Sequence, residues 1–207
     1  MLWVYFQKGG IMMYPIFICS VIALMVTIER FIFISRTKKT SEILFEETIE
    51  MIKNNDIDGA IELCKNKSDS ISENIIKAGL DNLKRTDVAV KEIIENASTH
   101  EFPKVERFLP LLGTMVAVSP MFGLLGTVVG MIQSAEALAK LAGSNPSDLI
   151  AGISVALITT AYGLIVAIPS LLFYNYLVHR AQDVIAFISK RTDEITDLLV
   201  NKNFIKK

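Results

Sequence analysis

Three threonines lie deep inside stretches of sequence that carry no charged residue: Thr127, Thr159 and Thr160. A hydroxyl among apolar side chains needs a hydrogen-bond partner, because leaving it unpaired costs free energy. The partner is either a carbonyl three or four residues earlier in the same helix or a group in a polar path through the apolar region. Both interpretations stay open at the level of sequence. Thr127 and Thr160 are the candidates for an ion pathway.

Small residues recur around these threonines at a helical spacing. In the segment 149–178 they are four, four, three, four and three residues apart, and the segment 107–134 carries a similar face. Such spacing lets membrane helices approach closely. The predicted packing residues are Gly123, Gly126, Gly130, Gly152, Ala156 and Gly163. Thr127 and Thr160 lie on these faces, so neighbouring helices would bring their hydroxyls to a common surface.

Two prolines, Pro120 and Pro169, interrupt the same two segments. Each removes one helical hydrogen bond and predicts a kink. A tolerated bend and a gating hinge are equally good interpretations of such a kink.

Signatures of enzymes are missing from the sequence. It has no glycine-rich phosphate loop with a lysine, no Ser-His-Asp or Cys-His set in suitable surroundings, and no pair of carboxylates within an apolar run. His100 and His179 have no second ligand at a spacing typical of metal sites. We therefore expect no catalytic residue, no cofactor and no metal site, and a protein that is not an enzyme.

The elements that position the threonines are long uncharged runs. Of the 207 residues, 51% are hydrophobic, and residues 9–28, 108–135 and 149–178 form uncharged runs of 20, 28 and 30 residues. A helix needs about 20 apolar residues to span a bilayer. The sequence predicts an all-α membrane protein with three transmembrane helices, at 9–35, 107–134 and 149–178, and with long cytoplasmic helical extensions.

Lysine and arginine concentrate on one side of the predicted spans, which is the cytoplasmic side in most membrane proteins. They are Arg36, Lys38, Lys39, Lys104, Arg107 and Arg180, against Lys8 and Lys140 on the other side. This bias places segment 1–8 and loop 135–148 in the periplasm, and the helical domain 36–106 and the C-terminal helix 179–207 in the cytoplasm. Arg30, at the end of the first span, is expected to reach interfacial water. The net charge of −1 predicts no nucleic-acid partner.

Several long motifs resemble one family. The opening residues 1–10, MLWVYFQKGG, look like the start of ExbB and TolQ proteins. Residues 119–132, SPMFGLLGTVVGMI, and 152–169, GISVALITTAYGLIVAIP, resemble the two signature spans of the MotA/TolQ/ExbB proton-channel family. Three predicted spans bring the chain nearer to the ExbB/TolQ branch than to four-span flagellar subunits of the MotA type.

The resemblance implies a homo-oligomeric ring, a pentamer, in the bacterial inner membrane. The second and third helices would line a lumen that holds a single-span partner like ExbD or TolR, whose Asp takes up and releases protons. Proton motive force would then drive motion that energises TonB-dependent outer-membrane transport, with a TonB-like protein as a further candidate partner. Thr127 and Thr160 match the family's lumen-facing threonines.

One position departs from the family pattern. ExbB and TolQ relatives usually have Glu where this chain has Val155. Valine neither binds a proton nor accepts a hydrogen bond, so the threonines, water and the partner's Asp would have to suffice. Alternatively, the valine reflects an altered ion preference or an inactive chain. The alternatives for function are a TolQ-like or gliding-type stator with another client, and a membrane scaffold that conducts no ion.

Overall fold

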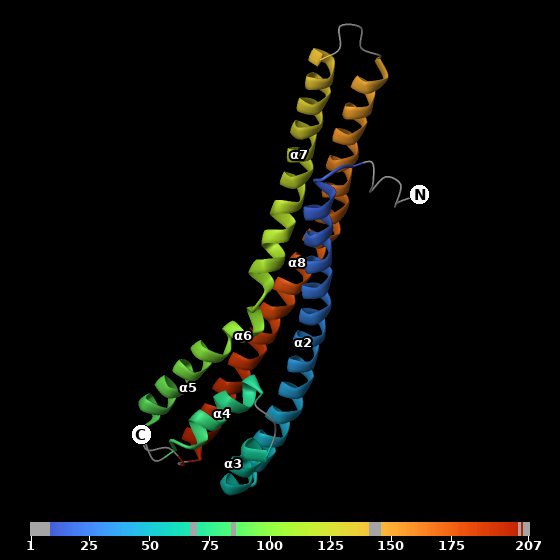
Figure 1. The fold of residues 1–207 in the computed structure, drawn as a ribbon. Coiled ribbons are helices and arrows are strands. Elements are labelled where there is room, and N and C mark those ends of the chain that lie inside the picture. Colours follow the sequence, from blue (N-terminus) through green and yellow to red (C-terminus); the bar gives the residue numbers. More distant parts are fainter. Residues whose placement is uncertain (1–8, 67–69, 84–85, 141–145, 203, 205–207) are drawn as a thin grey trace. The chain divides into compact units, whose positions relative to one another are not determined.

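The computed structural model describes residues 9–66, 70–83, 86–140, 146–202 and 204, and they are almost entirely helical. The helices are α2 (Met13–Lys53), α3 (Ile57–Asn66), α4 (Ile71–Leu80), α5 (Asp87–Glu101), α6 (Pro103–Glu106), α7 (Leu109–Lys140) and α8 (Pro146–Asn201) (Figure 1). No β-strand occurs within these ranges. Three helices, α2, α7 and α8, are long and apolar enough to cross a membrane. The prediction of an all-α membrane protein with three spans is confirmed.

The helices are longer than the predicted spans. Helix α2 continues without interruption from the first apolar run to Lys53, and α7 extends to Lys140, so residues 135–140 are helical instead of forming a loop. Neither extension contains a glycine or proline that would stop a helix. The predicted periplasmic segment 1–8 and the middle of the predicted loop, residues 141–145, lie outside the described residues.

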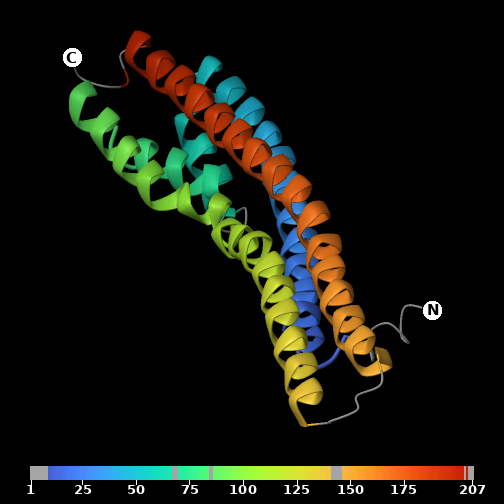
Figure 2. The same cartoon turned by 90° about the horizontal axis from the view of Figure 1, so that it is seen from above.

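The chain forms two compact units. The first comprises the residues up to Glu29 together with Phe108–Leu177, and the second comprises Arg30–Arg107 together with the residues from Val178 onward. In the first unit α7 and α8 run side by side (Figures 1 and 2). One face of the start of α2 is buried within this unit. The buried residues follow one another at intervals of three or four: Met13, Ile16, Cys19 and Ala23. Apolar side chains on its other face are exposed, as expected of a lipid-facing helix.

The second unit has a core of large apolar side chains. Phe45 of α2 is fully buried, and its ring meets that of Phe187 of α8 edge-to-face at 6.1 Å between centroids. Every helix of the unit contributes buried residues, among them Ile52, Ala60, Cys64, Ile75, Val90, Val105 and Ile188. The short helices pack on one another, with α4 against both α3 and α5, and the Ser72 hydroxyl of α4 donates to the Ser41 hydroxyl of α2 at 2.6 Å.

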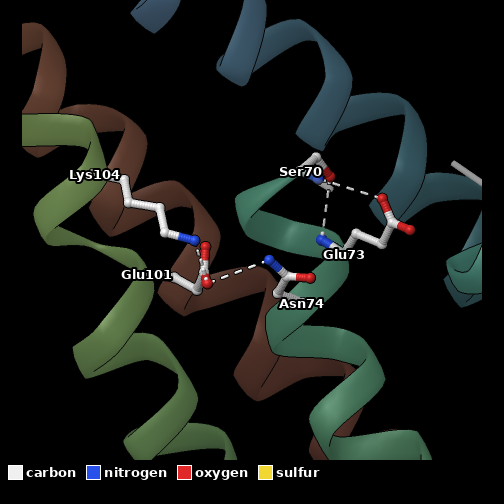
Figure 3. Close-up of polar contacts among 5 residues, drawn as sticks. All are labelled: Ser70, Glu73, Asn74, Glu101 and Lys104. Carbon is white, nitrogen blue, oxygen red and sulfur yellow. Dashed lines mark hydrogen bonds and ion pairs between the residues drawn. The ribbon is translucent and has the colours of Figure 1, made fainter. Parts of the chain in front are cut away.

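Side-chain hydrogen bonds fix the short helix α4 in this unit (Figure 3). Ser70 and Glu73 form a capping box, in which the Ser70 hydroxyl accepts from the Glu73 N–H and the Glu73 carboxylate accepts from the Ser70 N–H. Asn74 Nδ2 donates to Glu101 Oε1 at 3.2 Å, and Lys104 Nζ donates to the same oxygen at 2.6 Å. This shared carboxylate links α4 to the end of α5.

Arg30 does not reach water as expected. Its side chain is only 3% exposed, Nη1 donates to the Lys104 carbonyl oxygen at 3.1 Å, and the guanidinium lies 4.4 Å from the centre of the Phe33 ring. Helix α6 is a single turn, and its carbonyls have no partner further along the helix. Arg30 is buried because it supplies a donor to this helix end.

Candidate functional site

Helices α7 and α8 touch through their backbones. A Cβ atom on Gly123 would lie 3.0 Å from the Thr159 carbonyl oxygen and 3.1 Å from the Thr160 Cα. A Cβ on Gly163 would lie 2.7 Å from the Ser119 carbonyl oxygen. At Gly163 this distance leaves no room for a side chain, and at Gly123 a side chain would force the α8 backbone to shift. We call the contact between α7 and α8 the α7–α8 seam.

The seam continues toward the loop between the two helices. A Cβ on Gly130 would lie 3.0 Å from the Gly152 carbonyl oxygen and 3.4 Å from the Ala156 Cβ, and a Cβ on Gly152 would collide with the Ser134 hydroxyl. Ala156 is 5% exposed. The structure therefore brings together, along one antiparallel contact, the small residues whose spacing was singled out in the sequence.

Thr159 is the hydroxyl at the centre of the seam. It is fully buried, and it fills the space opposite Gly126, whose Cβ would come within 2.6 Å of the Thr159 Cβ. Its Oγ1 donates to the Ala156 carbonyl oxygen of its own helix at 2.8 Å. The sequence-based choice of pathway residues omitted it, although its place three residues after Ala156 and four before Gly163 assigns it to the same face.

Thr160 is half-buried and makes the hydrogen bond that crosses the seam. Its Oγ1 donates to the Gly123 carbonyl oxygen of α7 at 3.3 Å. This distance exceeds the usual 2.5 to 3.0 Å of a hydroxyl donor, so the bond is weak. A weak bond leaves the Thr160 hydroxyl able to exchange its partner for water or another polar group at little cost.

Thr127 is also half-buried, but its hydrogen bond stays within α7. Its Oγ1 donates to the Leu124 carbonyl oxygen at 2.6 Å. In the described part of the chain Thr127 and Thr160 do not bond to each other. Of the two predicted pathway residues, the structure thus joins only Thr160 to the neighbouring helix.

The two prolines each have a serine neighbour that bonds backward. Pro120 lies within α7 and follows Ser119, whose hydroxyl donates to the Met115 carbonyl at 2.6 Å. Pro169 lies within α8 and precedes Ser170, whose hydroxyl donates to the Val166 carbonyl at 2.7 Å. A proline also frees a carbonyl one residue away from each of these acceptors. Both helices therefore carry several polar groups close to their proline, and both continue past it.

Val155 faces a different neighbour. Its Cγ1 lies 3.8 Å from where a Cβ would stand on Gly10, a residue with φ of +69° before α2. The next turn of α8 contacts the same segment, because Ile158 lies 3.5 Å from the corresponding position at Gly9. The Val155 side chain therefore lies beside the segment that precedes α2.

The fold and the seam define a multi-span membrane protein in which two uncharged helices pack at backbone contact and carry hydroxyls at that contact. Comparison with known proteins also identifies a membrane protein family. The model of the MotA/TolQ/ExbB proton channel family matches residues 67–190. The chain belongs to this family, which is one of channels and not of a known enzyme class.

The relatives come from both named branches. The putative biopolymer transport protein ExbB-like 3 of Synechocystis is 32% identical over 91% of this chain and 90% of its own length. The biopolymer transport protein exbB1 of Vibrio cholerae is 28% identical over 79% of this chain and 73% of its own length. The Tol-Pal system protein TolQ of Pseudomonas aeruginosa is 37% identical, over 51% of this chain and 46% of its own length.

Proposed function

We propose that this chain is the ring-forming subunit of an ion-driven motor in the inner membrane. Together with a single-span partner like ExbD or TolR, it converts proton motive force into mechanical work, and its client is TonB-dependent outer-membrane transport. Five copies enclose the partner's helix, with α7 and α8 lining the lumen. One proton crossing 100 mV releases about 2.3 kcal/mol, so a few protons suffice to move the partner against the ring.

The observation that carries the proposal is the Thr160 hydroxyl on the Gly123 carbonyl. The glycines bring the two backbones close enough for a hydroxyl of one helix to reach a carbonyl of the other. In surroundings without charged side chains, a hydroxyl can relay a proton because it both donates and accepts a hydrogen bond. A carbonyl oxygen can coordinate an ion. The family membership of the chain supports the same function.

The orientation rests on the distribution of basic residues. The second unit contains Arg36, Lys38, Lys39 and Arg180 close to the ends of the apolar runs. By the positive-inside rule this unit lies in the cytoplasm, and residues 1–8 and the α7–α8 loop lie in the periplasm. Proteolysis of the full chain in inside-out vesicles should then cleave within α3 to α5 and spare the loop.

A specific observation favours a second candidate, a scaffold that conducts no ion. The hydroxyls of Thr127 and Thr159 bond to carbonyls of their own helices, and so do those of Ser119, Ser134 and Ser170. Hydroxyls that bond within their own helix need no ion or water as a partner, so their side chains can serve only to fill space at the seam. In the scaffold, the glycines would pack helices and Thr160 would add a single weak bond.

Proton uptake distinguishes the two candidates. The complex with its partner is placed in vesicles, and the parent is compared with Thr160→Val, Thr127→Val and the matched control Thr27→Val, whose hydroxyl bonds to the Ala23 carbonyl within α2. We expect Thr160→Val to lower the flux about tenfold, which corresponds to about 1.4 kcal/mol in a barrier. Thr127→Val should have a smaller effect, and Thr27→Val none.

Unchanged flux in both seam variants would remove the threonines from the mechanism. An absence of flux in the parent, with a partner known to be active, would favour the scaffold. A TonB-like gene beside the partner's gene would point to nutrient uptake, whereas a Tol-Pal neighbourhood would point to a TolQ-like client.

Position 155 tests whether the ring needs its own acid. Because the Val155 side chain lies beside Gly10, we expect Val155→Glu to keep the flux or to change only its pH dependence. A large gain of flux from a nearly inactive parent would show that the missing acid matters.

A further inference from the structure

A groove of about 410 Å³ lies between α2 and α8 within the second unit. Its floor is apolar, because Ile34 and Val184 are 3% and 1% exposed. The polar groups on its walls are Ser35, Lys38, Lys39, Glu42, Arg180 and Asp183. The volume lies in the range of about 300 to 1,000 Å³ that small-ligand sites occupy. We call it the α2–α8 groove.

The groove combines donors from two helices. Lys38 and Lys39 of α2 and Arg180 of α8 supply three positive charges, against the two carboxylates of Glu42 and Asp183. The ion pair between Lys38 Nζ and Glu42 Oε1 is long, at 3.8 Å, and both side chains are more than 40% exposed, so it holds the lysine only weakly. Ammonium, guanidinium and hydroxyl donors around a net charge of +1 suit a phosphate group with one negative charge.

The groove lies where two apolar segments end. On α8 the uncharged run ends at residue 178, two residues before Arg180. On α2 the exposed apolar side chains Phe31 and Ile32 precede Ser35, which lies about 4.5 Å further along the helix axis than Ile32. A ligand whose phosphate occupies the groove would therefore have an apolar helix surface beside it for hydrocarbon chains.

We propose that the α2–α8 groove binds the phosphate headgroup of an anionic phospholipid, with the acyl chains along the exposed apolar side chains of α2. Basic sites beside membrane helices attract anionic lipids of the cytoplasmic leaflet. A soluble phosphate ester offers the same headgroup chemistry but gains nothing from the apolar surface. The proposal shares the membrane orientation of the proposed function but does not depend on ion flux.

Native mass spectrometry of the full chain in detergent tests the site. The chain is incubated with phosphatidylglycerol, with phosphatidylcholine, or with glycerol phosphate, and the retained ligand is counted. We expect phosphatidylglycerol to be retained in preference to the other two. Lys38→Gln and Arg180→Gln should each weaken its binding about fivefold, the factor that about 1 kcal/mol for each base near an anionic surface represents.

Arg36→Gln is the matched control, because Arg36 is an exposed base on the same stretch of α2 that does not line the groove. Arg180→Lys keeps the charge and should keep most of the binding. This result would show that Arg180→Gln weakens binding through the lost charge and not through misfolding. An equal loss in Arg36→Gln would reduce the effect to general surface attraction and overturn the site. Equal retention of phosphatidylcholine would overturn headgroup recognition, and glycerol phosphate bound as tightly as the lipid would overturn the lipid assignment.

The outcome is independent of the motor. Loss of phosphatidylglycerol selectivity with normal proton uptake would reject only the lipid site. Selective lipid binding without proton uptake would reject only the proposed function.

Discussion

The two units hold their helices together by opposite means. In the first, α7 and α8 meet through glycines, with Gly123 and Gly163 at backbone contact and Thr159 opposite Gly126. In the second, large side chains fill the space between helices, as Phe45 and Ile75 do at full burial. Hydroxyls bond to helix carbonyls in both units, but the second unit also has a capping box and an ion pair at its helix ends.

The difference follows from the solvent that each unit faces. Among lipid tails, moving a leucine from the helix surface to a helix contact gains little, so close approach of small residues provides the attraction. In water, burying one large apolar side chain is worth about 1.5 to 3 kcal/mol. We therefore expect the first unit to lose stability when a small residue of the seam is enlarged, and the second unit to lose stability when a large core residue is truncated.

The largest effect is expected from truncating the core of the second unit. Phe45→Ala removes a fully buried ring and its contact with Phe187, which should cost about 4 kcal/mol in the free energy of unfolding. Chemical denaturation of the full chain in detergent, followed by circular dichroism, measures this cost. Phe45→Leu should cost less than half as much. Equal stability of parent and Phe45→Ala would show that side-chain packing does not hold this unit.

Enlarging a seam residue should be the next most damaging change. Gly163→Val places a Cβ 2.7 Å from the Ser119 carbonyl oxygen, and overpacking of this kind costs about 3 kcal/mol. The same denaturation assay applies. The control is Gly113→Ala, whose Cβ would meet only the Tyr174 ring at 3.2 Å, a side chain that can move. If Gly163→Val matched its control, the seam would not depend on backbone contact.

Removing the buried cation of the second unit should have an intermediate effect. Arg30→Met leaves the Lys104 carbonyl without its donor, and we expect a loss of about 2 kcal/mol from the missing hydrogen bond of a charged donor. Arg36→Met, at an exposed position of the same helix, should change stability by less than about 0.5 kcal/mol. Comparable losses in the two variants would contradict the role assigned to Arg30.

The smallest effect is expected at the cap of α4. Ser70→Ala removes the hydroxyl that accepts from the Glu73 N–H and should cost about 1 kcal/mol, whereas Ser70→Asp keeps an acceptor and should cost less. Hydrogen exchange of the first turn of α4 is the most direct measurement. Exchange that is as slow in Ser70→Ala as in the parent would count against the capping box.

The sequence was sufficient to predict the spans but not how far α2 and α7 continue beyond them. Uncharged runs identify hydrocarbon-crossing segments because charges are excluded there, so α2, α7 and α8 could be predicted. The ends of α2 and α7 could not, because a helix that leaves the membrane keeps its backbone hydrogen bonds in water, and nothing between Glu29 and Lys53 interrupts α2. Helix α4 was not predicted, although Ser70 and Glu73 have capping-box spacing at its start and are followed by Ile75 and Ile76.

The hydroxyls of the seam mark a second limit of sequence. Residue spacing identifies the glycines that meet α8, because a small-residue stripe is a property of one helix alone. The partner of a threonine hydroxyl depends on its χ1 rotamer and on the approach of the neighbouring helix. For this reason Thr127 and Thr160 look equivalent in sequence, but one bonds within its helix and the other across the seam. Arg30 escaped prediction similarly, because its acceptor lies 74 residues away.

The side chain at position 155 meets a left-handed glycine at the beginning of α2 and takes no part in the glycine contacts of α7. A mutation there changes the chemistry of the protein without disturbing how α7 and α8 fit together. Evolution could thus exchange the side chain at this point in a single step while every other residue of the hairpin stayed as it was.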